Sequence, residues 1–77
     1  MLTSPAPIPA NAPQRGSRWT HWKHPGEFYT VDGVGHHSET GELVVAYRDP
    51  QGNTWVRPLA MWSDEARPGV TRFVVAP

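Results

Sequence analysis

The chain has 77 residues, enough for one small domain, and its 7 Lys and Arg residues balance its 7 Asp and Glu residues. This balance argues against duplex DNA as a partner, because proteins that bind duplex nucleic acid usually carry an excess of positive charge. The sequence contains no cysteine, which excludes disulfides and is typical of a reducing, cytoplasmic location. It has no apolar run of membrane-spanning length and no secretory signal pattern, so we expect no membrane partner.

The first part of the chain is predicted to form a disordered tail rich in proline and alanine. Residues 1–17 hold four of the nine prolines, namely Pro5, Pro7, Pro9 and Pro13. Because proline lacks a backbone donor and the apolar residues here are scattered, this stretch has neither a strand nor a helix period. The folded domain is therefore predicted to comprise residues 18–77.

From residue 18 onward the apolar residues recur with a period of two, which is typical of strands. Gly33 and Gly35, inside the second strand, predict a bulge or sharp bend. The sequence Asp49-Pro50-Gln51-Gly52 predicts a tight hairpin turn with Gly52 at positive φ. The predicted strands are residues 18–23 (broken by His24-Pro25-Gly26), 27–37, 42–48, 53–57 and 71–75, with one helical turn over 59–62 and a loop over 63–69.

These elements predict an all-β fold, namely a small SH3-like barrel of about five antiparallel strands with a one-turn helix before the last strand. A closed or nearly closed sheet has no free edge strands, which otherwise invite aggregation. The alternative is an open five-stranded antiparallel sheet that dimerises to cover one face. A domain this small is only marginally stable, so its aromatic residues must supply most of the core.

Several short motifs follow one another in a fixed order along the predicted domain. They are residues 19–23, residues 33–40, Tyr47-Arg48, residues 55–59, Met61-Trp62 and Arg72-Phe73. In this order the motifs resemble the domain of unknown function 1653 family, a small bacterial and phage domain, over residues 19–75. That family usually has tyrosine where this chain has Trp19 and Trp22, which keep an aromatic ring and lose a hydroxyl. The resemblance implies the fold and no activity.

The four histidines raise the question of a metal site, which needs three or four converging ligands. His21 and His24 flank a predicted turn, and His36 and His37 point to opposite faces of a predicted strand. Cysteine is absent, and no metal-binding helix motif such as His-Glu-x-x-His occurs. We therefore expect structural or surface histidines, with neither a metal nor another cofactor.

His37, Ser38 and Glu39 are the residue types of a hydrolase triad, but a triad forms where distant segments converge. Adjacent residues do not converge in this way, and the Ser38 hydroxyl is better explained as a cap of the turn. A domain of this size also leaves little volume for a pocket that excludes water. We expect no catalytic residues and no enzymatic activity from this domain alone.

A ligand site is predicted where arginines and aromatic residues come together. Tyr47 and Arg48 lie on one arm of a predicted hairpin, and Trp55 and Arg57 lie on the other. Guanidinium groups beside an aromatic platform suit a nucleobase and its phosphate. In the alternative, the aromatic residues form the core and the arginines cover them as a lid. The candidate ligand-binding residues are Trp19, His21, His37, Glu39, Tyr47, Arg48, Trp55 and Arg57.

The sequence therefore predicts a binding module for a nucleotide-like or phosphorylated small molecule, for short single-stranded nucleic acid, or for a peptide segment. The alternative is a protein-interaction adaptor, with the tail as a flexible tether, or an accessory subunit without a small-molecule ligand. A protein partner or a second copy of the chain would also help to stabilise so small a core.

Overall fold

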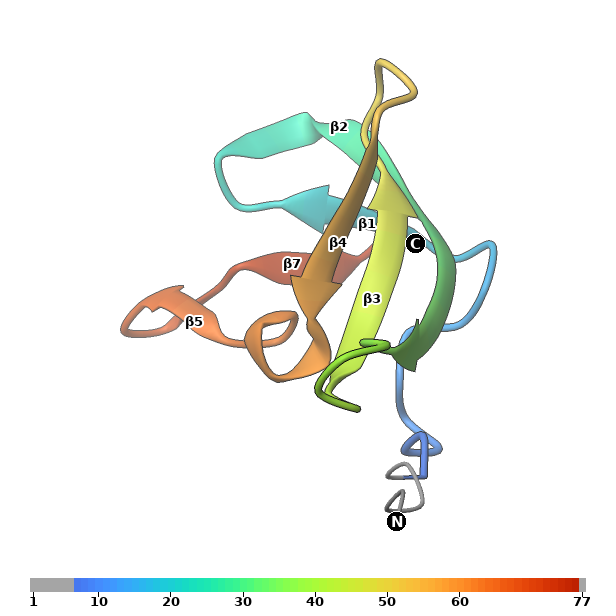
Figure 1. Cartoon of the computed structure of the whole chain (residues 1–77). Coiled ribbons are helices and arrows are strands. Elements are labelled where there is room, and N and C mark those ends of the chain that lie inside the picture. The colour runs from blue at the N-terminus through green and yellow to red at the C-terminus, as the bar shows by residue number, and fades with distance from the viewer. Residues whose placement is uncertain (1–6, 77) are drawn as a thin grey trace, which may run out of the picture.

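The computed structural model describes residues 7–76, which form one curled antiparallel sheet with a small hairpin beside it (Figure 1). The main sheet has five strands in the order β4-β3-β2-β1-β7, and β5 and β6 pair separately. The elements are β1 (Arg18–His21), β2 (His24–His36), β3 (Leu43–Arg48), β4 (Thr54–Pro58), the 3-10 turn η1 (Leu59–Met61), β5 (Glu65–Arg67), β6 (Val70–Thr71) and β7 (Phe73–Val75). Within the described residues, no helix is long and apolar enough to span a membrane.

The long strand β2 gives the sheet its curl. Over its 13 residues β2 pairs first with β1 and then with β3, and Figure 1 shows it bending between the two. Its register with β3 shifts between Val31 and Gly33, which confirms the bulge predicted from Gly33 and Gly35. A bulge bends the strand that contains it, so one face of the sheet is concave.

The predicted all-β class is confirmed, including a short helical turn before the last strand. The sheet is not closed into a barrel, because β4 and β7 stand at its two edges without pairing. β7 has only three residues, and β4 ends at Pro58, which has no backbone N–H to donate. Side chains connect these edges instead, since the Arg57 guanidinium lies 5.8 Å from the centre of the Phe73 ring.

Two local predictions are wrong. The break predicted at His24-Pro25-Gly26 lies inside β2, and the chain turns two residues earlier, where the Lys23 N–H donates to His21 Nδ1 at 3.1 Å. The loop predicted over residues 63–69 contains β5. Gly69 adopts φ +80°, a conformation that suits a tight hairpin turn, and so lets β5 pair with β6.

The core is small and largely aromatic. Its four buried residues are at most 3% exposed, namely Val31, Val45, Trp62 and Phe73. The Trp62 and Phe73 rings stack with their centroids 4.1 Å apart and their planes 3° from parallel. Burying such large rings provides most of the apolar area that a domain of this size can remove from water, as the aromatic content predicted.

The chain joins the sheet before the predicted domain start at residue 18. Pro13 is buried, the Gly16 N–H donates to the Val31 carbonyl at 2.8 Å, and the Val31 N–H donates to the Ser17 carbonyl at 2.9 Å. Proline can pack its ring without needing a backbone donor, so its abundance did not exclude residues 13–17 from the fold. The predicted disorder of residues 1–6 lies outside the described residues.

Candidate functional site

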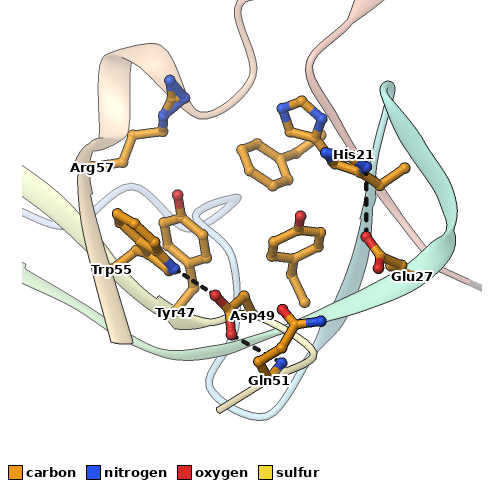
Figure 2. Close-up of a pocket in the computed structure, with 10 residues that line it drawn as sticks. His21, Glu27, Tyr47, Asp49, Gln51, Trp55 and Arg57 are labelled. Carbon is orange, nitrogen blue, oxygen red and sulfur yellow. Dashed lines mark hydrogen bonds and ion pairs between the residues drawn. The ribbon is translucent and has the colours of Figure 1, made fainter. Parts of the chain in front are cut away.

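The concave face of the sheet holds a pocket of about 410 Å³, within the usual size of small-molecule sites. It opens between the β3–β4 hairpin and the β1–β2 turn, and Figure 2 shows Trp55 and Arg57 on one side and His21 and Glu27 on the other. The pocket is lined by His21, His24, Glu27, Tyr29, Tyr47, Asp49, Gln51, Trp55, Arg57 and Phe73.

The alternation of side chains along the strands places these residues on one face. In the β3–β4 ladder Tyr47 lies opposite Trp55, and Arg57 lies opposite the buried Val45, so all four side chains share the concave face. In the β1–β7 ladder His21 lies opposite Phe73. Two ladders at opposite edges of the sheet thus meet across the pocket.

Tyr29, Tyr47 and Phe73 form the floor of the pocket. Their ring centroids lie 5.6 to 6.1 Å apart, and the His21 ring meets Phe73 edge-on at 5.0 Å. Edge-to-face packing of this kind is favourable and geometrically specific. Burial is the largest cause that raises the pKa of both the Tyr29 and the Tyr47 phenol, so both hydroxyls stay protonated and able to donate at neutral pH.

Trp55 forms the wall of the pocket and is held there by Asp49. Its side chain is 53% exposed, yet its Nε1–H donates to Asp49 Oδ2 at 2.9 Å. The same carboxylate accepts hydrogen bonds from the Gln51 N–H, the Asn53 N–H and the Asn53 side-chain amide. The bond from Trp55, followed by those from Asn53 and Gln51, lowers the pKa of Asp49. The ionised carboxylate therefore ties the hairpin turn to the indole.

Arg57 is the fixed positive charge of the pocket. Among the residues that the structure describes, no carboxylate forms an ion pair with it, and its guanidinium lies 5.8 Å from the centre of the Phe73 ring in the floor of the pocket. Burial, assisted by the nearby charges of His24, Arg72, Arg57 and Lys23, lowers the pKa of His21. At neutral pH His21 is therefore uncharged. On the same side of the pocket, Glu27 Oε2 lies 3.5 Å from His24 Nδ1.

Four of the predicted site residues come together here, namely His21, Tyr47, Trp55 and Arg57. Trp19 lies elsewhere on the concave face, where it meets the buried Trp62 edge-on at 5.4 Å and donates its indole N–H to the Ser17 hydroxyl at 2.9 Å. It supports the core and does not line the pocket.

The predicted site with the guanidinium groups of both Arg48 and Arg57 beside one aromatic platform is not formed. In the β3–β4 ladder Arg57 lies opposite Val45, and Val45 is three positions before Arg48 in β3. Because side chains alternate between the two faces of a strand, an odd spacing places Arg48 and Arg57 on opposite faces of the sheet. Arg48 Nε donates to Asp32 Oδ1 at 3.0 Å. The sequence pattern placed both arginines near one aromatic cluster without fixing the register.

His37 and Glu39 lie in the exposed turn between β2 and β3, away from the pocket. His37 Nδ1 accepts the N–H groups of Glu39 and Thr40 at 3.1 and 3.3 Å, and Thr40 Oγ1 accepts the Glu42 N–H. The side-chain bonds of this turn thus come from His37 and Thr40 and not from Ser38.

Six lining residues were not predicted, because their places depend on long-range pairing. Tyr29 lies inside the strand predicted over residues 27–37 and was given no role, Asp49 and Gln51 were interpreted only as turn residues, and Phe73 required the pairing of β7 with β1. The spacing of Asp49 and Trp55 across one hairpin was the signal that could have revealed their bond. His24 and Glu27 line the rim from the start of β2.

Within residues 7–76 no three His, Asp or Glu side chains gather to hold a metal ion.

Comparison with protein families gives one finding. Residues 17–74 match the family described as "Protein of unknown function (DUF1653)". No curated protein and no solved structure matches the chain. The match begins at Ser17, whose carbonyl accepts the Val31 N–H, and ends at residue 74 inside β7, so it covers β1 to β6 and part of β7.

Proposed function

The chain belongs to the DUF1653 family, as its motifs predicted, and because that description states no activity we propose a function from the pocket itself. We propose that the protein is a binding module for a nucleotide-like ligand. The flat ring of the ligand packs against Trp55 and the aromatic floor, and its anionic group meets Arg57. The ligand is bound in the cytoplasm, in keeping with the lack of cysteine.

One observation carries this proposal: the exposed Trp55 indole is locked by Asp49 next to a guanidinium that has no carboxylate partner among the described residues. A ring that is already immobilised loses little conformational freedom when a ligand packs on it, which favours binding. Bases of every kind stack on aromatic side chains, and arginine suits phosphate or carboxylate through its planar fork.

We propose binding without catalysis. Asp49 is occupied by four hydrogen-bond donors, and Glu27 lies beside His24. Neither carboxylate is therefore placed to orient His21 as a general base, which usually needs such a partner. His21 Nδ1 already accepts the Lys23 N–H.

The test is calorimetric titration of the purified protein with nucleoside 5′-monophosphates. Arg57→Gln should weaken binding about tenfold or more, which corresponds to loss of a charge-assisted hydrogen bond of ~1.5–3 kcal/mol. Arg48→Gln is the matched control, because it removes an arginine from the opposite face of the same hairpin, and it should leave the affinity unchanged. Equal effects of both variants, or no binding by the parent, would contradict the proposal.

A protein-interaction adaptor remains the second candidate, and one observation favours it. The edge strands β4 and β7 carry exposed valines, with Val56 63% and Val75 56% exposed, and unpaired strand edges can accept a further strand. An adaptor predicts that nucleotides leave the melting temperature unchanged, whereas a ligand that binds only the folded protein raises it.

A further inference from the structure

Although the net charge of the chain is zero, several cations have no ion-pair partner among the described residues, and three of them lie in or near the pocket. Of the arginines, Arg48 and Arg72 pair with Asp32 and Asp64, at 3.0 Å each. Lys23, Arg57 and Arg67 have no carboxylate partner among the described residues. Arg57 lies in the pocket, and the other two cations lie close to its far rim.

Both Lys23 and Arg67 lie over the ring of Trp22. Lys23 Nζ lies 5.3 Å from the centre of the Trp22 ring, and the Arg67 guanidinium lies 5.4 Å from it, both within cation–π range. The Trp22 ring in turn stacks beside the His21 ring, with centroids 6.2 Å apart and planes 29° from parallel. Because His21 lines the pocket and its ring packs beside Trp22, the cations over Trp22 lie next to the His21 side of the pocket.

The carboxylates that face this region already accept hydrogen bonds or lie at a distance, and Asp49 in the pocket lining accepts N–H groups of Gln51, Asn53 and Trp55. Glu65 accepts the Gly69 N–H at 2.9 Å, and Glu27 lies beside His24. Glu39 and Glu42 lie in the turn that follows β2, at the opposite end of this 13-residue strand from Lys23. The pocket end of the molecule therefore carries three cations without an ion-pair partner in the described part of the chain, Lys23, Arg57 and Arg67, beside two carboxylates, Glu27 and Asp49, whose oxygens already contact other groups.

We infer that the ligand of the pocket is single-stranded nucleic acid, with one base against Trp55 and the phosphate of a neighbouring nucleotide at Lys23 and Arg67. This inference rests on the proposed function, since it needs the pocket to accept a base. Figure 2 places Arg57 and His21 on opposite sides of the pocket, so a strand that crosses it meets cations on both sides. Proteins that bind single strands combine a positive track with aromatic rings on which bases stack.

The experiment compares adenosine 5′-monophosphate with an adenylate trinucleotide, titrated by calorimetry at several salt concentrations. The trinucleotide should bind at least tenfold more tightly than the mononucleotide. Lys23→Gln and Arg67→Gln should each weaken trinucleotide binding about three- to tenfold, lower the salt slope by about 0.7 for the lost phosphate contact, and leave mononucleotide binding unchanged.

Arg18→Gln is the matched control. The Arg18 guanidinium lies 4.7 Å from the centre of the Phe28 ring, the same kind of arrangement, but Arg18 alternates with Trp19 and His21 along β1 and so faces the convex side. It should affect neither ligand. Lys23→Arg and Arg67→Lys, which keep the charge, should restore trinucleotide affinity if the contacts are made to phosphate.

The outcomes separate the two proposals. If the mononucleotide binds and the trinucleotide binds no better, the nucleic-acid inference is overturned while the proposed function stands. If neither ligand binds, both fail. If Lys23→Gln and Arg67→Gln weaken mononucleotide and trinucleotide equally, or the charge-keeping variants do not restore affinity, the two cations act through Trp22 packing and the inference is overturned.

Discussion

The Trp55 indole donates its N–H to the Asp49 carboxylate at 2.9 Å, so the residue that begins the β3–β4 turn also orients the wall of the pocket. Turn geometry and pocket geometry are thereby coupled. A change in either residue should affect ligand binding through the orientation of the indole and not through charge alone.

Trp55→Phe keeps an aromatic ring and removes the donor to Asp49. We expect nucleotide affinity to fall several-fold, because a ring without this bond must lose rotational freedom when a ligand packs on it. Calorimetric titration measures the change. Phe28→Leu, which alters an exposed aromatic residue outside the pocket lining, should leave the affinity unaltered, and an equal loss in that control would count against the role given to Trp55.

Asp49 should give the protein an acid-sensitive component of stability. Its pKa is lowered in the folded state, first by the Trp55 bond and then by Asn53 and Gln51, so the folded state favours the ionised form. That stability is present above the ordinary aspartate pKa of 3.8 and is lost as the pH falls through the lower, folded-state pKa. Melting temperatures of the parent and of Asp49→Asn, measured from pH 7 to pH 2.5, should differ at neutral pH and converge in acid. A constant difference would contradict this.

Gly52 tests the turn itself. Its φ of +88° confirms the positive value predicted from the Asp49-Pro50-Gln51-Gly52 sequence. Because a β-carbon is unfavourable in that conformation, Gly52→Val should destabilise the fold by about 1–2 kcal/mol in urea denaturation. Gly26→Val is the control, since Gly26 has an ordinary φ and open space where a β-carbon would lie. Similar losses in both variants would mean that φ is not the cause.

The N-terminal boundary can be tested with two truncations. Removal of residues 1–12 should change the free energy of unfolding by less than ~0.5 kcal/mol, as expected of surface changes. Removal of residues 1–17 also deletes buried Pro13 and two backbone hydrogen bonds to Val31, and should cost about 1–3 kcal/mol. If the two truncated proteins unfold at the same urea concentration, residues 13–17 do not contribute to the fold.

The parts of the structure that depend on local signals were predictable. Alternating apolar residues and turn residues predicted the main strands, the β2 bulge and the Gly52 conformation. Register was not predictable, because pairing one position further along reverses the face of every side chain. For this reason the prediction placed Arg48 beside Arg57, although the two lie on opposite faces. It also missed that the ring of Phe73, from the distant strand β7, packs against the ring of Tyr47 in β3.

Pro13 and the Asp49–Trp55 hydrogen bond show a second reason why parts of the structure could not be predicted from the sequence: a residue with a sufficient local explanation can make a further contact that this explanation does not require. Proline content indicates disorder only when the ring finds no apolar surface, and Pro13 finds one. Likewise, an aspartate at the first position of a turn is explained by the turn alone, so nothing in the sequence required its second oxygen to hold an indole.

The central claim is that Trp55 is the binding wall of the pocket, and two-dimensional NMR of the indole N–H groups tests it most directly. The chain has four tryptophans, so single Trp→Phe variants can assign each indole signal. On titration with adenosine 5′-monophosphate, the Trp55 signal should shift most and saturate with the binding isotherm, while the signal of Trp62, which is completely buried, should move little. An unchanged Trp55 signal at saturating nucleotide would contradict the claim.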